Sequence, residues 1–158
     1  MKNIGLAGGF LSRDALDSEV KHKMHLGFCK DCYAVQILDQ IDPDLMFRQG
    51  YFYFSSSIQT LKDHFKEYAE EVVDRFITQP DEACVIEFGC NDGVLLTPLA
   101  NKNIGTLIGV DPADNVVNTI NDTRINIVNS YFDLNCAKSI VLNHGKADII
   151  LANNVFAH

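Results

Sequence analysis

A glycine-rich turn in the middle of the chain has the residue types that let a ligand approach the backbone closely. An apolar run ends at Glu87, and the turn that follows contains Gly89, Asn91 and Gly93. Glycine and asparagine tolerate a left-handed backbone, and the free amides at the start of the following helix attract polar ligand groups. The sequence therefore predicts a ligand-binding turn between a strand and a helix.

Two acidic residues narrow the chemistry of this turn. The glycine spacing lacks the complete Gly-x-Gly-x-x-Gly pyrophosphate fingerprint, and Glu87 would repel a pyrophosphate but suit a cationic ligand. Asp111 ends the next apolar run, about 20 residues on, where a carboxylate can accept both hydroxyls of a ribose. A nucleoside that carries a positive charge and no pyrophosphate is S-adenosylmethionine. The alternative is a tight turn that only connects a strand to a helix.

Four apolar runs must position these residues. They have the sequences CVIEFG, TLIGVD, INIVN and ADIILANN, and a segment long enough for a helix separates each from the next. Continuous apolar runs are typical of parallel strands buried on both faces. The sequence predicts an α/β fold with a partial, doubly wound Rossmann-like sheet. Because such sheets normally continue past the point where the strand order reverses, we expect a fragment of a larger domain.

One amphipathic helix is expected before the first of these strands, over residues 57–78. Its apolar residues recur every three or four positions and form one stripe, which predicts packing against the sheet. Ser56 or Ser57 is expected to cap its start, and Pro80 to follow its end. Its lysines and acidic residues, including Lys62, Lys66 and Glu70, are expected to face solvent.

Composition and charge exclude several classes of protein. The chain has 158 residues, 47% of them hydrophobic, and a net charge of −8. Its basic residues are scattered singly, which argues against a nucleic-acid partner but is compatible with a local basic pocket for a small phosphate. The opening apolar stretch is too short for a signal sequence or a membrane span. Five cysteines, an odd number, favour a reducing compartment, and we expect a cytoplasmic protein.

Three blocks of the sequence resemble one enzyme family. VIEFGCNDGVLLTPL and GVDPADNVV resemble the first two motifs of class I S-adenosylmethionine-dependent methyltransferases, in particular the C-methyltransferases of nucleotide-linked deoxysugars. HLGFCKDCYAVQILDQIDPDLMF resembles the second half of that family's zinc-binding module, and YFYFSSSI resembles its bridging element. The resemblance implies a remnant of the zinc-binding-like module over 1–50, a bridging segment and helix over 51–80, and the first half of the cofactor-binding domain over 81–158. It implies truncation at both ends.

The resemblance also implies roles for individual residues. The methionine end of the cofactor would lie against Glu87, Gly89, Asn91 and Gly93, and its ribose against Asp111. Ser130, Tyr131 and Phe132 would flank the adenine, and Asn153 and Asn154 would line the side of methyl transfer, with His158 just beyond. For Asn153, Asn154 and His158, a strand end with capping residues is the alternative.

Tyrosines of the bridging element are the candidate catalytic residues. In the resembling family, one such tyrosine reaches the active site, where a sugar carbon beside a ketone loses a proton before methyl transfer. This implies Tyr51 as first choice and Tyr53 as second, with ordinary aromatic packing as the alternative. A tyrosine with a pKa near 10 needs a neighbouring histidine or lysine to act as a base. His158 lies just beyond the fourth strand, and the family's partner histidine comes from farther along the chain.

Cys29 and Cys32 form a Cys-x-x-Cys pair that suits two thiolates on one tetrahedral zinc ion. A structural site needs two more ligands, and the family's earlier Cys-x-x-Cys pair is absent from this sequence. His22 and His25 could substitute, although nothing in their spacing requires it. Cys84, Cys90 and Cys136 are expected to be small buried residues.

The function that these expectations favour is C-methylation of a nucleotide-linked deoxysugar, with S-adenosylmethionine as donor. Two alternatives stay open. One is an O- or N-methyltransferase that acts on another small molecule with the same cofactor turn. The other is a non-catalytic binding or assembly module that self-associates through an unpaired sheet edge.

Overall fold

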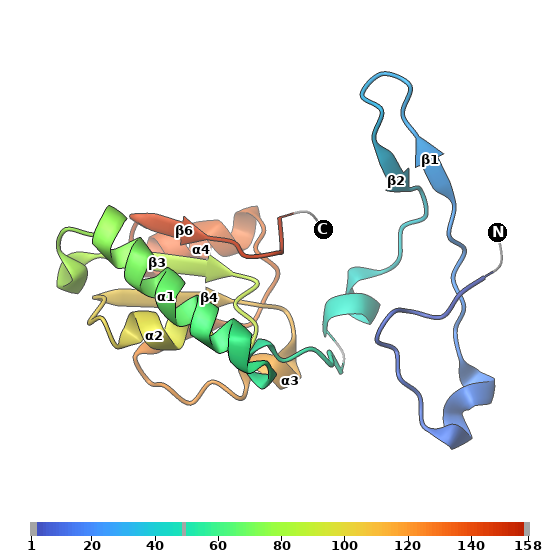
Figure 1. The fold of residues 1–158 in the computed structure, drawn as a ribbon, viewed down its shortest axis with the longest axis horizontal. Coiled ribbons are helices and arrows are strands. Elements are labelled where there is room, and N and C mark those ends of the chain that lie inside the picture. Colours follow the sequence, from blue (N-terminus) through green and yellow to red (C-terminus); the bar gives the residue numbers. More distant parts are fainter. Residues whose placement is uncertain (1–2, 49, 157–158) are drawn as a thin grey trace. The chain divides into compact units, whose positions relative to one another are not determined.

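The chain divides into two compact units, Met1–Phe52 and Tyr53–His158. The structure is a computed structural model and describes residues 3–48 and 50–156, with the elements shown in Figure 1. No helix in these ranges is long and apolar enough to cross a membrane. Each unit is described separately below.

The first unit contains one short hairpin and little regular structure besides. Strand β1 (Leu26–Phe28) pairs antiparallel with β2 (Val35–Ile37), and short helical segments lie at Arg13–Ser18 and Asp44–Arg48. None of the described residues up to Phe52 is buried. This unit therefore has no hydrophobic core among the described residues.

The second unit is built on a parallel sheet of four strands. These are β3 (Cys84–Phe88), β4 (Thr106–Val110), β5 (Ile125–Val128) and β6 (Ile149–Leu151). They lie in the order β5-β4-β3-β6, and every pair is parallel, which confirms the predicted α/β class. The chain moves outward from β3 through β5 and then returns to the other side of β3. The strand order thus reverses at β3, and ligands in such sheets bind at the carboxyl ends of strands beside this point.

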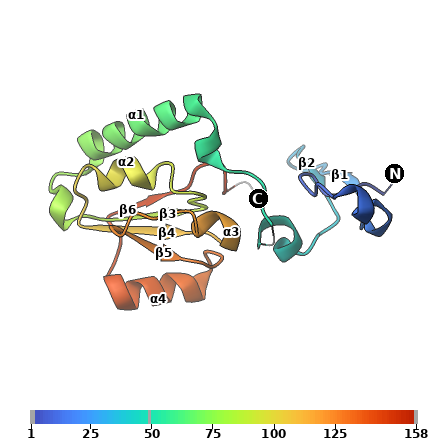
Figure 2. The same cartoon turned by 90° about the horizontal axis from the view of Figure 1, so that it is seen from below.

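Helices cover both faces of this sheet (Figure 2). Helices α1 (Gln59–Phe76) and α2 (Leu96–Ala100) lie on one face, and α4 (Leu134–His144) lies on the other. The short α3 (Asp114–Val117) follows the carboxyl end of β4. The apolar stripe of α1 is the face that packs, because Phe65, Ala69 and Val72 are buried.

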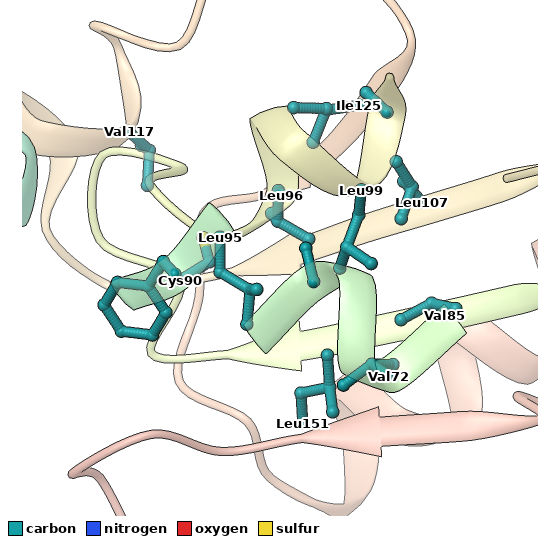
Figure 3. Close-up of a cluster of buried hydrophobic side chains, with 13 residues drawn as sticks. Val72, Val85, Cys90, Leu95, Leu96, Leu99, Leu107, Val117, Ile125 and Leu151 are labelled. Carbon is teal, nitrogen blue, oxygen red and sulfur yellow. The ribbon is translucent and has the colours of Figure 1, made fainter. Parts of the chain in front are cut away.

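The larger core cluster lies between the sheet and the pair α1 and α2 (Figure 3). Leu95, Leu96 and Leu99 from the α2 region are fully buried there and meet Val85 of β3 and Leu107 of β4. The smaller cluster under α4 comprises Cys84, Ile86, Ile108, Val110, Cys136 and Ile140. Successive residues of β3 alternate between the two clusters, as the pleat of a strand requires. The three cysteines predicted to be buried, Cys84, Cys90 and Cys136, are buried.

The start of α1 differs from the prediction. The residue that precedes the helix is Ile58, whose side chain cannot cap, so the predicted serine cap is wrong. Ser55–Ser57 form a separate single turn, in which the Ser57 hydroxyl donates to the Phe54 carbonyl at 2.7 Å. The serines instead turn the backbone amides of Ser55 and Ser56 toward the glycine-rich turn, as described below.

Candidate functional site

The carboxyl ends of β3 and β4 meet at the glycine-rich turn. Gly89, Asn91 and Gly93 have φ angles of 68°, 52° and 75°, in the left-handed region that most residues avoid. A side chain at position 89 would also collide with a neighbour, because an added Cβ would lie 2.2 Å from Cγ2 of Val155. Backbone conformation and space thus both require glycine at position 89.

Glu87 is the most unusual polar residue of the site. It is 3% exposed, and its Oε1 accepts a hydrogen bond from Nδ2 of Asn153 at 3.3 Å. Its Oε2 is buried and has no hydrogen-bond partner in the part of the chain that the structure describes. Burial raises the pKa of Glu87 to about 8, the bond from Asn153 opposes that rise, and the charges of Asp111 and Asp92 add to it. A cationic hydrogen-bond donor would satisfy this carboxylate.

Asp111 is held in place by the backbone. Its Oδ2 accepts from the Asn91 amide and its Oδ1 from the Ala113 amide, both at 2.9 Å. Burial raises the pKa of Asp111, and these two hydrogen bonds oppose the rise. Each carboxylate oxygen can accept a second hydrogen bond, so the group retains the capacity to bind two hydroxyls.

The side chain of Asn91 joins the turn to the segment before α1. Its Oδ1 accepts from the Ser55 amide at 2.9 Å, and its Nδ2 donates to the Tyr53 carbonyl at 3.0 Å. Asp92 acts beside it, because its carboxylate accepts from the Ser56 amide at 3.0 Å. We call these contacts the turn–segment clamp. Each polar group of the Asn91 side chain thus has one hydrogen-bond partner, and the Asn91 backbone amide donates to Asp111.

The residues after β5 lie beside β3 and β4. Phe132 is half-buried, and its ring stacks on that of Phe88 with centroids 4.7 Å apart and planes 4° apart. Tyr131 is also half-buried. Asn129, which the sequence analysis did not single out, donates through Nδ2 to the Asp111 carbonyl at 2.9 Å. This bond joins the ends of β4 and β5, and no sequence motif indicates it.

The two asparagines after β6 differ in their surroundings. Asn153 is half-buried and contacts Glu87, as given above, whereas Asn154 is exposed and has a φ of 55°. The structure therefore brings Asn153 into contact with Glu87. For Asn154 the structure shows a left-handed turn residue.

The candidate catalytic residues fall in different parts of the chain. Tyr51 belongs to the first unit, where its ring centroid lies 5.9 Å from that of Phe52 and 6.3 Å from that of Phe47. Tyr53 belongs to the second unit and is 38% exposed. His158 lies outside the described residues. The catalytic roles of all three stay predictions.

Cys29 and Cys32 lie in the connection between β1 and β2. The turn is closed by hydrogen bonds from the Cys29 amide to the Ala34 carbonyl and from the Tyr33 amide to the Cys29 carbonyl. Hydrogen bonding from the Cys32 backbone lowers the pKa of Cys29. No group of three or more candidate metal ligands is present in residues 3–48 and 50–156. His25, one of the two histidines that could add a zinc ligand, instead has its Nδ1 3.0 Å from Oδ1 of Asp39.

Comparisons with known proteins show which family this chain is similar to. The family model described as methyltransferase domain matches residues 61–158. The C-methyltransferase NovU of Streptomyces niveus is 29% identical over 154 residues, which cover 97% of this chain and 36% of NovU. The chain thus spans about a third of the length of this curated relative.

Two crystal structures of the plantazolicin methyltransferase BpumL, both with bound SAH, show a limited likeness. One has a TM-score of 0.43 at 16% identity and covers 61% of this chain and 37% of that protein. The other has a TM-score of 0.35 at 15% identity and covers 43% and 27%. The family match includes all but the first two residues of α1, the whole sheet and the glycine-rich turn. This chain belongs to the methyltransferase domain family.

Proposed function

We propose that the second unit binds S-adenosylmethionine at the carboxyl ends of β3 and β4, and that the chain functions as part of a methyltransferase. The observation that carries this proposal is Glu87, whose buried oxygen lacks a partner beside a turn that glycines keep open. S-adenosylmethionine carries an ammonium group that would satisfy that oxygen. The residues present therefore fit the cofactor.

Each residue of the site has a part in holding the cofactor. Asp111 would accept the ribose hydroxyls, Gly89 and Gly93 would leave room for the methionine part, and Glu87 would accept from its ammonium group. Phe132 and Tyr131 are placed after β5, the strand beside β4, which suits contact with the adenine. When bound, S-adenosylmethionine supplies a methyl group that its sulfonium has already activated.

We propose carbon as the methyl acceptor, in a nucleotide-linked deoxysugar. Support comes from the relative, whose name describes it as a C-methyltransferase, and from the tyrosines that precede α1. A tyrosine would remove the proton from the carbon beside a ketone, with a histidine such as His158 to lower the cost of ionising the phenol. The protein would mainly hold the methyl group of the cofactor in line with the acceptor carbon and move that proton.

A zinc ion is the least supported part of this proposal. Cys29 and Cys32 would supply two thiolates, and the lowered pKa of Cys29 favours the ionised form that binds zinc. Two further ligands would be required for a structural site. Zinc, if bound, would stabilise the hairpin of the first unit and take no part in methyl transfer.

Calorimetric titration with S-adenosylhomocysteine tests the cofactor site. The wild-type chain is expected to bind saturably. Asp111→Asn should bind at least about tenfold more weakly, because the nitrogen that replaces one carboxylate oxygen cannot accept a hydrogen bond from a ribose hydroxyl or from a backbone amide. Asp114→Asn, an exposed change on α3, is the control and should bind as the wild type does. Melting curves establish that both variants are folded. A folded wild-type chain that does not bind would refute the proposal.

A further inference from the structure

A recess lies between α1 and α2, and neither Glu87 nor Asp111 lines it. Its volume is about 540 Å³, in the range of small-molecule sites. The two helices run side by side over the sheet in both Figure 1 and Figure 2. We call it the lysine groove, and it is lined by Ser56, Lys62, Lys66, Glu70, Asp92, Gly93, Val94, Thr97, Pro98, Asn101 and Lys102.

Positive charge is concentrated in the lysine groove. Three of the chain's 13 lysine and arginine residues line it, although the chain as a whole has a net charge of −8. Lys62 and Lys66 lie one turn apart on α1, a spacing at which like charges repel each other. Both side chains are exposed, as the sequence predicts, and both also line this recess.

The carboxylates of the groove are already engaged. Glu70 lies one turn from Lys66 on α1, yet its Oε1 pairs across the groove with Nζ of Lys102 at 3.6 Å. Asp92 accepts from the Ser56 amide as part of the turn–segment clamp. Within the described residues, neither Lys62 nor Lys66 forms an ion pair. The ammonium groups of Lys62 and Lys66 are therefore not held in ion pairs, although Glu70 and Asp92 line the same groove.

The wall formed by α2 adds neutral hydrogen-bonding groups. Thr97 and Asn101 lie one turn apart and both line the groove. Oδ1 of Asn101 accepts from Nη2 of Arg124 at 3.0 Å, which fixes the orientation of the amide and leaves its Nδ2 as a donor. Ammonium groups on one wall and a hydroxyl and an amide donor on the other suit a ligand that only accepts hydrogen bonds.

We propose that the lysine groove binds the phosphate or pyrophosphate group of a small molecule, held between Lys62 and Lys66 of α1 and Thr97 and Asn101 of α2. Gly93 lines this groove and also belongs to the turn of the proposed cofactor site, so the two sites adjoin, but neither Glu87 nor Asp111 lines the groove. The inference does not depend on the proposed function, since the groove and its charges exist whether or not the chain binds S-adenosylmethionine.

Titration of the whole chain with inorganic pyrophosphate tests this site, with S-adenosylhomocysteine present throughout. We expect saturable binding that weakens about tenfold in Lys62→Ala/Lys66→Ala, because that variant lacks two of the three positive charges that line the groove. Lys138→Ala/Lys146→Ala removes the same charge from α4 and the loop after it, and should bind as the wild type does. Absence of binding, or an equal loss in both double variants, would overturn the inference.

A second variant tests the other wall of the groove. Asn101→Asp keeps the oxygen that accepts from Arg124 but places a carboxylate in the groove, and it should weaken pyrophosphate binding at least about tenfold. Unchanged affinity in this variant would contradict the proposed site. Competition with uridine diphosphate identifies the source of the phosphate. Displacement assigns the site to a nucleotide ligand, and failure to displace assigns it to free phosphate or pyrophosphate.

Discussion

Glu87 combines almost complete burial with an oxygen that has no hydrogen-bond partner in the described part of the chain. A buried unsatisfied carboxylate costs free energy, and a protein reduces that cost by keeping the group protonated or by binding a cation beside it. The raised pKa of Glu87 corresponds to the first solution, and a cationic cofactor would supply the second. Protonation and cofactor binding should therefore compete at this residue.

The affinity for S-adenosylhomocysteine should rise with pH up to the pKa of Glu87, which is about 8. Below that pH the carboxyl must release its proton before it can pair with an ammonium, so affinity should rise by up to about tenfold for each pH unit. Calorimetric titrations at about pH 6, 7 and 8 measure this slope. Glu87→Gln cannot ionise and should show a flat profile over the same range. Identical profiles for the two proteins would exclude Glu87 as the titrating group.

Glu87 should also make the unbound fold lose stability as the pH rises from 4.5 to about 8. Its pKa is 4.5 when unperturbed and about 8 in the folded chain, so the folded state holds the extra proton between these values. The free energy of unfolding contributed by Glu87 should fall by about 1.4 kcal/mol per pH unit across that window as pH rises. Urea unfolding of the wild type and Glu87→Gln at several pH values isolates this contribution as a difference. A difference that does not change with pH would contradict the buried, protonated state.

Among the structural elements, the turn–segment clamp joins two pieces of chain that are far apart in the sequence. Asn91→Gly should destabilise the fold by about 1–3 kcal/mol, because glycine keeps the left-handed backbone but leaves the amide of buried Ser55 without its partner. Hydrogen exchange should accelerate at residues 53–57. Asn103→Gly is a matched control, since Asn103 also has a positive φ, of 58°, but is exposed. Equal effects of the two substitutions would show that the clamp adds nothing.

Packing of α2 against the sheet should dominate the stability of the second unit. Leu99 is fully buried in the cluster of Figure 3, so Leu99→Ala should lower the free energy of unfolding by about 2–5 kcal/mol. Leu142→Ala on α4 removes the same atoms from a side chain that is 85% exposed and should change it by less than about 0.5 kcal/mol. Chemical denaturation of both variants provides the measurement. A small loss for Leu99→Ala would mean that α2 is only loosely attached.

Local patterns were sufficient to predict the elements but not the contacts between them. The four apolar runs contain the four strands, and the stripe over 57–78 contains α1. The serine cap failed because the amides of Ser55 and Ser56 are held by Asn91 and Asp92, more than thirty residues later. The contact between Asn153 and Glu87 is likewise long-range, because it forms only where β6 pairs with β3. Such pairings depend on strand order, which no short motif encodes.

For the whole molecule, the free edge of the sheet has consequences for association. Strand β6 pairs with β3, and no other described strand lies on its outer side. Beside it is a recess lined by Tyr68, Val72, Phe76 and 148–151. An unpaired edge next to apolar side chains favours pairing between chains. The predicted self-association through this edge thus has a location in the structure.

We expect the chain to self-associate with rising concentration and Ile150→Lys to reduce that tendency. A lysine on an edge strand opposes pairing, and Ile150 is 56% exposed, so the change leaves the core intact. Sedimentation velocity over a range of concentrations measures the effect. Leu142→Lys makes the same kind of change on α4 and should associate as the wild type does. A monomeric wild-type chain would remove the assembly interpretation.

The two units were predictable from the sequence to different extents. In the second unit, the class of the sheet and the positions of Glu87 and Asp111 at adjacent strand ends follow from apolar runs and spacing. The lysine groove does not, because Lys62 and Lys102 come together only through the packing of α1 on α2. In the first unit, the Cys-x-x-Cys pair predicts a metal site, and the structure shows a hairpin that no buried side chain supports among the described residues.

The most direct test of the proposed cofactor site is an amide-resolved NMR titration of the isotope-labelled chain with S-adenosylhomocysteine. The account predicts that the largest shifts belong to the turn of Gly89, Asn91 and Gly93 and to the backbone of 111–113, and that the amides of α4 stay unchanged. Shifts confined to other elements, or no shifts at saturating ligand, would contradict the claim that this sheet edge is a cofactor site.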